Sequence, residues 1–474
     1  MKNCTYSYIA TILIISSTAL LPGAYAGESP PTAVRSIAWS ECPADWFPEA
    51  ASQDVVCGTL DVPMQRYGNQ RSRESVRLAL SKLPATGEAK GSVILVAGGP
   101  GQSGLDFSLA QSDAMTRLRA SFDIIGYDPR GIGRSEPKIV CNTKPDVPSY
   151  SRQSMEACLT SMDKAFLAEL STLDAVDDLN DIRAALGDEK ITLVAYSYGT
   201  MVAQLYAERY PFYVRAMVLD GVVDLSENYA TMFTNQLRGF NLSFYRFAQY
   251  CANTGNCPLS ASPADATATY RSILASAERG DILRSDGTTV TAAEIYTYTM
   301  SALYSEANWS ELAQFLSQLG DGSVIDETAG ELMDSLGAEE ATKAQMVITC
   351  ADYGRLSSTP ALPFLAGTFA ALEDDPDPSN DDPCSAWPFE AQFTPHIPRR
   401  DKSLPPLLFV SQTGDPTTPY GNAVKMSAAF ESPLITRDGN GHSFVLIEDV
   451  PCVDDKVVDY IRYPNIPLGD LYCR

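Results

Sequence analysis

The chain has 474 residues and a formal net charge of −24 at pH 7, with 45% hydrophobic and 20% charged residues. This length exceeds one average domain, so it predicts either one large domain with an insertion or two domains. The negative charge argues against binding to nucleic acid or to an anionic membrane surface, because both would repel the protein.

The N-terminal residues have the pattern of an export signal. Lys2 is the only basic residue before an apolar stretch at residues 9–21, and a small-x-small site ends at Ala26. Cleavage after Ala26 would remove residues 1–26 as a signal peptide. A membrane anchor is the alternative, but the apolar core is short for a span. We therefore expect an exported protein, periplasmic or extracellular, without a membrane attachment after cleavage.

Eleven cysteines also favour export, because disulfides persist in oxidising compartments. Cys4 would leave with the signal, and an even set of ten would remain for a disulfide framework. Proximity along the chain pairs Cys42 with Cys57, Cys141 with Cys158, Cys251 with Cys257, Cys350 with Cys384, and Cys452 with Cys473. The sequence itself leaves other pairings open. A metal site is not expected, since the cysteines lack zinc-knuckle spacing and the chain has only two histidines.

Short apolar runs bounded by Gly, Pro or Asp predict strands that are buried on both faces of a parallel sheet. These runs lie at residues 92–97, 122–127, 191–195, 216–219, 407–410 and 434–436, after two earlier strands near residues 55–64 and 74–83. Helical patterns alternate with the strands, notably at residues 172–186, 200–210 and 420–430. The alternation predicts an α/β fold with a mostly parallel, doubly wound sheet.

One long interval, residues 225–397, breaks this alternation. Its pattern is mostly helical, with segments at residues 270–277, 292–303 and 309–319. We interpret the interval as a cap inserted between two core strands. The core then consists of residues 27–224 and residues 398–474. An acidic, Pro-rich stretch at residues 373–378 is interpreted as a solvated loop without a chemical role.

Ser197 lies where the apolar run at residues 191–195 ends and a helical pattern begins. Ala195 and Gly199, two residues before and two after the serine, are small enough for a tight turn between strand and helix. Such a turn pushes the serine hydroxyl out of the path of the chain, as in a nucleophile elbow. The elbow usually has glycine at the position of Ala195, and an ordinary serine in a turn is the alternative interpretation.

A serine becomes a strong nucleophile when a base takes its proton and a carboxylate orients that base. His442 and Asp415 each follow a predicted strand, so their loops should converge with Ser197 at the carboxyl end of the sheet. The sequence therefore predicts a triad of Ser197, Asp415 and His442. His396 is the competing base, but it lies in a Pro-flanked segment and is interpreted as structural. For Asp415 the alternative is a turn-forming Asp-Pro pair.

Acyl transfer also needs hydrogen-bond donors for the oxyanion that develops on the substrate. The sequence Gly-Gly-Pro-Gly at residues 98–101 directly follows a predicted strand, and glycine there lets backbone N–H groups face the substrate. We expect the N–H groups of Gly99 and Tyr198 to form the oxyanion hole. A phosphate-binding loop is the alternative, but no Gly-Lys-Ser/Thr follows. Asp128 and Arg130, after the next strand, are interpreted as structural.

Together these motifs resemble the exported tripeptidyl aminopeptidase branch of the proline iminopeptidase-like α/β-hydrolases. The resemblance covers nearly the whole mature chain and includes residues 128–135 (Asp-x-Arg-Gly-x-Gly-x-Ser), Gly-Asp-Pro around Asp415 and Gly-His at His442. It implies the α/β-hydrolase fold, with Ser197 as nucleophile, His442 as base and Asp415 as the orienting acid. Members release one to three residues from a free N-terminus, and some are esterases. Ala97 departs from the histidine that often precedes the glycine-rich loop.

An aminopeptidase must bind an α-ammonium group, and Glu227 and Asp352 are the candidate substrate-binding carboxylates near the junction of cap and core. The expected partners are therefore peptides with a free N-terminus. No cofactor is expected, and the protein should be a monomer. A carboxylesterase or amidase for small neutral substrates is the first alternative, because the same triad serves both reactions. A non-catalytic binding protein is the second, although such a protein would not need the triad.

Overall fold

The computed structural model describes residues 36–47, 54–66, 74–109, 112–144, 147–255, 257–320, 339–355 and 382–474. The expected signal peptide and the acidic stretch at residues 373–378 lie outside these described residues.

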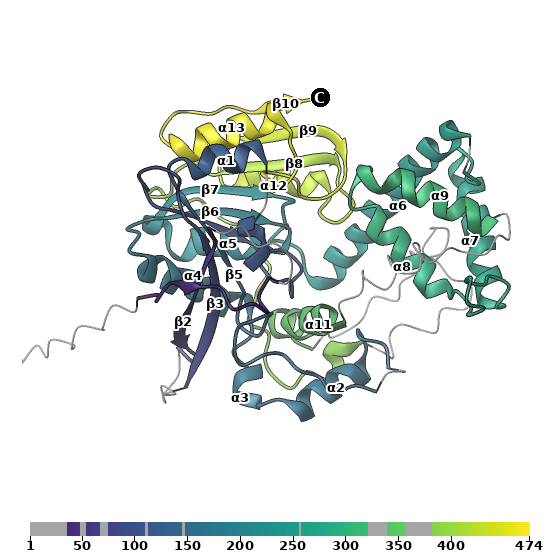
Figure 1. Ribbon diagram of the computed structural model, residues 1–474, viewed down its shortest axis with the longest axis horizontal. Coiled ribbons are helices and arrows are strands. Elements are labelled where there is room, and N and C mark those ends of the chain that lie inside the picture. The colour runs from purple at the N-terminus through teal and green to yellow at the C-terminus, as the bar shows by residue number, and fades with distance from the viewer. Residues whose placement is uncertain are drawn as a thin grey trace, which may run out of the picture. The chain divides into compact units, whose positions relative to one another are not determined.

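A single twisted sheet organises the fold (Figure 1). Its strands are β1 (Ser40–Glu41), β2 (Val56–Pro63), β3 (Ser75–Leu83), β4 (Ser92–Val96), β5 (Asp123–Tyr127), β6 (Ile191–Tyr196), β7 (Val214–Asp220), β8 (Leu408–Gly414), β9 (Leu434–Asn440) and β10 (Leu471–Cys473). They are ordered β1-β2-β3-β5-β4-β6-β7-β8-β9-β10. Pairing is antiparallel from β1 to β3 and between β3 and β5, and parallel from β5 onward. The predicted mostly parallel, doubly wound sheet is confirmed.

Helices connect and cover these strands. The α-helices are α1 (Asp113–Arg119), α2 (Arg152–Ser161), α3 (Lys164–Leu167), α4 (Thr172–Leu186), α5 (Tyr198–Arg209), α6 (Tyr229–Thr254), α7 (Pro263–Glu278), α8 (Ala292–Ala302), α9 (Trp309–Gly320), α11 (Glu339–Tyr353), α12 (Tyr420–Ala429) and α13 (Pro451–Arg462). Short 3-10 helices are η1 (Leu105–Leu109), η2 (Pro211–Tyr213), η3 (Glu306–Asn308) and η5 (Pro383–Ala386).

Helix α4 shows how local sequence sets the limits of an element. Ser171 and Asp174 form a capping box at its start, in which each side chain accepts from the other residue's backbone N–H. Gly187 ends the helix with a φ of 81°, a left-handed conformation that glycine adopts without a steric penalty. The predicted helix at residues 172–186 therefore has the observed bounds.

Alternate side chains of the central strands point to opposite faces of the sheet. In β6, Leu193 and Ala195 pack in the apolar cluster that includes α4, α5 and α12. Val194 and Tyr196 pack in a second cluster that includes α1 and α13. The sheet is thus covered by helices on both faces, and its carboxyl edge is left to the loops that carry the candidate site.

The described residues between β7 and β8 include helices α6 to α9 and α11, as expected for a mainly helical insertion. The interval packs in two parts, however. Helices α6 to α9 share their own apolar cluster, which is centred on large side chains such as Phe247, Tyr270 and Trp309. Helix α11 instead contributes Met346 and Val347 to the cluster on the sheet. The boundaries of the proposed cap at residues 225–397 remain a prediction.

Five disulfides are formed, and they join the pairs expected from proximity along the chain. Cys350 and Cys384, which are 34 residues apart, connect α11 to η5. Cys251 and Cys257 close a loop of six residues at the end of α6. No helix in the described ranges is both long and apolar enough to cross a membrane.

Replacing Cys350 and Cys384 together by alanine should lower the free energy of unfolding by about 2–4 kcal/mol, because the bridge restricts a long loop in the unfolded chain. The same double replacement at Cys251 and Cys257 should cost less, because its loop is short. Urea unfolding of the oxidised proteins measures both losses. Equal losses would show that loop length does not control the contribution of these bridges.

Candidate active site

Ser197 occupies the sharp turn that the sequence predicts. Strand β6 ends at Tyr196, helix α5 begins at Tyr198, and Ser197 between them has φ 53° and ψ −125°. A positive φ is uncommon for a residue with a side chain. The turn is held by two hydrogen bonds, from Ser197 N–H to the Asp220 carbonyl at 2.9 Å and from Thr200 N–H to the Ser197 carbonyl at 2.8 Å.

Two glycines make room for this turn. A Cβ atom on Gly98 would lie 2.9 Å from the Cβ of Ser197, and a Cβ on Gly199 would lie 2.5 Å from the carbonyl oxygen of Val96. Such contacts are too close to exist without displacement of the backbone. Ala195, which stands where the elbow usually has glycine, is fully buried in β6 and is accommodated there.

Asp415 and His442 are in direct contact, as predicted. The Nδ1 atom of His442 lies 3.0 Å and 2.9 Å from the two carboxylate oxygens of Asp415. Asp415 also accepts hydrogen bonds from the N–H groups of Thr417 and Thr418 at 2.9 Å and 2.8 Å. A carboxylate only accepts hydrogen bonds, so Nδ1 of His442 carries the proton. Nε2 then has the lone pair in the neutral ring.

The environment of His442 favours its protonated form. Burial acts to lower the pKa of the imidazole, but the charge and hydrogen bond of Asp415 and the charge of Asp220 outweigh it, and the pKa is raised above 6.5. Nε2 is buried and has no hydrogen-bond partner among the described residues. It is therefore not bonded to Ser197 here, although such contacts often tighten only when substrate is bound.

His442 also contacts the inserted region. Its backbone N–H donates to the Tyr304 carbonyl at 2.8 Å, and the two rings meet edge to face at 5.5 Å between centroids. Next to this contact, Ser305 and Gly441 form an isolated β-bridge. The histidine is thus held by the insertion as well as by the core. Sequence reasoning missed Tyr304, because no motif marks it.

The glycine-rich loop lies beside the serine. Residues 98–101 line the same cavity as Ser197, and Gly99 has a φ of 101°, which a residue with a side chain rarely adopts. Asp128 supports the segment that follows, since its carboxylate accepts from Ser103 Oγ at 2.5 Å and from Gly104 N–H at 3.1 Å. The N–H of Tyr198 is in the first turn of α5, where no helix carbonyl can accept it.

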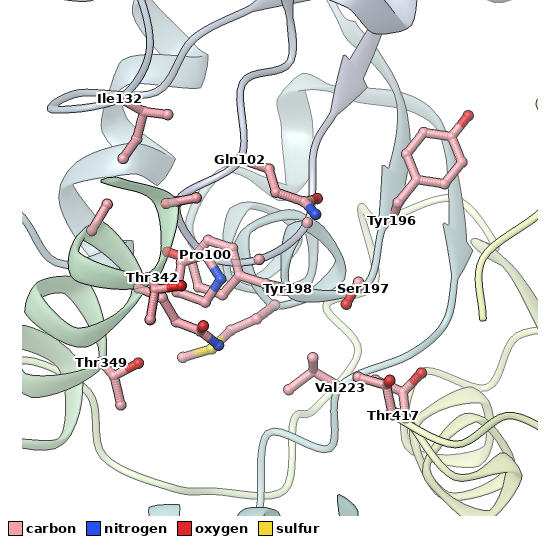
Figure 2. A pocket seen from close by; sticks show the side chains of 18 of the residues that line it. Pro100, Gln102, Ile132, Tyr196, Ser197, Tyr198, Val223, Thr342, Thr349 and Thr417 are labelled. Atoms are coloured by element: carbon pink, nitrogen blue, oxygen red, sulfur yellow. The ribbon is translucent and has the colours of Figure 1, made fainter. Parts of the chain in front are cut away.

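A cavity of about 1080 Å³ opens over these groups. Figure 2 shows Ser197 near Pro100 and Tyr198, with Thr342 and Thr349 of α11 on another side of the cavity and Thr417 on a third. Its lining includes Ser197, His442, the glycine-rich loop and aromatic side chains of the insertion, namely Tyr229, Phe233, Phe240, Tyr304 and Tyr353. The volume slightly exceeds the ~300–1,000 Å³ of typical small-molecule sites.

The two candidate substrate-binding carboxylates have different positions. Asp352 lines the cavity, whereas Glu227 is not among the described residues that line it. Glu227 accepts a hydrogen bond from the side chain of Asn235. Asp352 accepts from Thr172 N–H at 2.7 Å and from Thr172 Oγ1 at 2.6 Å, and no lysine or arginine among the described residues acts on it. Burial raises the pKa of Asp352 to about 7.

His396 is separate from these groups. Its Nε2 atom lies 2.8 Å from a carboxylate oxygen of Glu208, and it is not among the described residues lining the cavity. This position agrees with its interpretation as a structural histidine. Within the described ranges, no cluster of three or more His, Cys, Asp or Glu side chains is arranged to hold a metal ion.

Comparison with known proteins places the chain in a family. Residues 91–449 match the family described as the alpha/beta hydrolase fold. The chain belongs to the alpha/beta hydrolase family. Within this family, it is 35% identical over 470 residues to YuaR of Escherichia coli (strain K12), a hydrolase by name, with 93% of each chain covered.

Other relatives in the alpha/beta hydrolase family include both peptidases and an esterase by name. Serine protease Hip1 of Mycobacterium tuberculosis (strain H37Rv) is 31% identical, with 98% of this chain and 96% of the relative covered. Carboxylesterase B of the same strain is 30% identical, covering 95% and 92%. The tripeptidyl aminopeptidase of Streptomyces coelicolor is 29% identical, covering 92% and 86%. The resemblance seen in the sequence is thereby confirmed.

Activity should fall on the acid side with a midpoint above pH 6.5. His442 can accept a proton only when it is neutral, and its raised pKa means that it becomes protonated at a higher pH than a free histidine. The measurement is kcat/KM for a neutral ester between pH 5 and 9. His396→Ala should leave the midpoint unchanged. A midpoint at or below 6.5 would contradict the assignment of His442 as base.

Proposed function

We propose that this alpha/beta hydrolase is an exported serine peptidase of the aminopeptidase type, which releases short units of one to three residues from the N-terminus of peptides. The observation that carries the proposal is the cavity that contains Ser197 at a strained turn, the His442–Asp415 pair and the buried carboxylate of Asp352. The five disulfides support export. The protein would act as a monomer, without a cofactor.

In the first half of the reaction, Ser197 Oγ attacks the scissile carbonyl carbon while Nε2 of His442 takes the hydroxyl proton. Asp415 holds the imidazole in the required tautomer and stabilises its positive charge. The N–H groups of Gly99 and Tyr198 would donate to the oxyanion, and each such donor contributes about 10²–10³ in rate. The C–N bond then breaks and His442 gives the proton to the amine, which leaves with the rest of the peptide. The N-terminal unit stays bound to Ser197 as an ester.

In the second half, water replaces the leaving amine. His442 takes a proton from the water as it attacks the ester carbonyl, and the same donors stabilise the second oxyanion. The bond to Ser197 Oγ breaks, the proton returns to the serine, and the short peptide leaves as a free acid. The enzyme is then restored with Ser197 and neutral His442.

Asp352 supports recognition of a free amine. It is a buried carboxylate at the cavity wall, and its partners in the described structure are the two polar groups of Thr172 rather than a cation. A buried charge without a counter-charge is costly. An α-ammonium group in the cavity would supply that counter-charge, which favours a substrate with a free N-terminus over one that is acylated.

A carboxylesterase is the second candidate function. The same serine, histidine and oxyanion donors cleave esters, and one relative with 30% identity is named Carboxylesterase B. Apolar and aromatic side chains of the cavity, such as Met232, Phe233 and Phe240, would suit a neutral acyl group. The carboxylate of Asp352 favours the peptidase over this alternative, because a neutral ester would leave it without a counter-charge.

Three fluorogenic substrates separate these functions: a tripeptide amide with a free amine, the same amide acetylated, and a short-chain ester. The mature protein should cleave the free amide far better than the acetylated one. Ser197→Ala should reduce all cleavage by about 10³-fold or more while the protein stays folded. Ester cleavage without amide cleavage would identify an esterase. No cleavage of any substrate would favour a binding protein.

Asp352→Asn should raise KM for the free-amine amide by about tenfold or more and leave the neutral ester nearly unaffected. Ammonium binding needs the ionised carboxylate, so KM for the wild-type protein should also fall as pH rises through about 7, the pKa of Asp352. The variant should lose this dependence.

Glu227→Gln is the matched comparison for Asp352→Asn, because its carboxylate is also buried but does not line the cavity among the described residues. It should change KM for the free-amine amide less. Thermal unfolding at pH 8 checks that both variants remain folded. Equal losses by Asp352→Asn on the amide and on the ester would refute amine binding by Asp352.

A further inference from the structure

A third carboxylate lies at the site but belongs to no motif of the sequence. Asp220 is the last residue of β7, the strand next to β6, which ends just before Ser197, and only 1% of Asp220 is exposed. Its backbone carbonyl accepts the Ser197 N–H at 2.9 Å. Asp220 therefore links the serine turn, through its backbone, to the residues that its side chain contacts.

The side chain of Asp220 contacts the loop that carries His442. A single carboxylate oxygen, Oδ2, accepts the N–H groups of Phe444 at 2.6 Å and Val445 at 2.8 Å. This loop is strained, since Ser443 and Leu446 have φ values of 54° and 62°. Two charge-assisted hydrogen bonds, donated by backbone N–H groups to a buried carboxylate, can hold such a conformation.

The ring of His442 lies close to the backbone of Gly221, the residue after Asp220. A Cβ atom there would be 2.8 Å from Cε1 of the His442 ring and 2.6 Å from the hydroxyl of Ser443. The ring therefore rests directly on the backbone beside Asp220, and the carboxylate is near enough to raise the pKa of His442. Burial in turn raises the pKa of Asp220 to about 7.

We propose that Asp220 is a positioning residue for His442, which fixes the histidine loop relative to Ser197 and provides a second negative charge beside the imidazole. This inference rests on the proposed serine hydrolase mechanism and extends it. The titratable groups that face His442 are then Asp415 from the loop after β8, Asp220 from β7 and Tyr304 from the insertion. The imidazolium that forms when Ser197 loses its proton would be stabilised by two carboxylates.

Two substitutions separate the charge from the hydrogen bonds. Asp220→Asn can keep both bonds, because both N–H groups reach the same oxygen, and it removes only the charge. The acid midpoint of kcat/KM should therefore move to lower pH by about half a unit or more. Asp220→Ala removes both bonds, and kcat should fall by about 10- to 100-fold while KM changes little, because the base is misplaced.

Asp454 provides the matched control. It is equally buried, with 2% exposed, and its carboxylate accepts the N–H groups of Leu446 at 3.3 Å and Val450 at 2.7 Å further along the same segment. It does not act on the pKa of His442. Asp454→Asn and Asp454→Ala should lower the melting temperature without moving the acid midpoint, and their kcat should stay within a few-fold of the wild type.

The measurement is the pH profile of hydrolysis together with the rate of labelling by a fluorophosphonate. In that reaction Ser197 Oγ bonds to phosphorus, fluoride leaves and His442 takes the proton, so the labelling rate reports on the base without a substrate-binding step. The inference is overturned if Asp220→Asn keeps the wild-type acid midpoint, or if Asp220→Ala loses no more kcat than Asp454→Ala. A wild-type protein that neither hydrolyses nor is labelled would instead refute the proposed function.

Discussion

The candidate site depends on one backbone constraint, the positive φ of Ser197 between β6 and α5. This turn exists because side chains are absent at Gly98 and Gly199, where the glycine-rich loop and strand β4 come within van der Waals distance of the elbow. The same absence of side chains brings Gly99, the proposed oxyanion donor of the glycine-rich loop, next to Ser197 and to Tyr198, the proposed donor at the start of α5. The need for glycine at positions 98 and 199 therefore determines the position of Ser197 and of the N–H groups that are proposed to stabilise the oxyanion.

Three buried carboxylates surround this turn, and each is compensated differently. Asp415 contacts the imidazole and two backbone N–H groups, and Asp220 contacts two backbone N–H groups of the histidine loop. The carboxylate of Asp352 is hydrogen-bonded only to Thr172 among the described residues, and Asp352 lines the cavity. Hydrogen bonding to backbone offsets part of the cost of burying a charge, but a complete counter-charge requires a cation. This difference is the reason that Asp352, rather than Asp220 or Asp415, is proposed to bind the cationic end of a ligand.

The core of the fold and the contact between Asp415 and His442 could be predicted from the sequence, because both follow from local patterns. Apolar runs such as residues 191–195 have the period and length of buried strands, and glycine and proline mark their ends. Asp220 and Tyr304 could not be identified in this way. Their contacts with His442 depend on how β7 and the inserted helices approach a loop more than a hundred residues away in the sequence. The division of the insertion into two packing units was equally hidden, because a helical pattern does not reveal which apolar face a helix will meet.

The bond between the inserted region and His442 is made through the main chain, from the N–H of His442 to the carbonyl of Tyr304. A carbonyl is present whichever residue occupies that position. The inserted helices can therefore change their side chains, and with them the shape and polarity of the cavity, while the connection that supports the histidine is retained. A substituted or transplanted insertion that preserves the backbone path at this point therefore keeps this hydrogen bond, and only the edge-to-face contact of the Tyr304 ring depends on the amino acid.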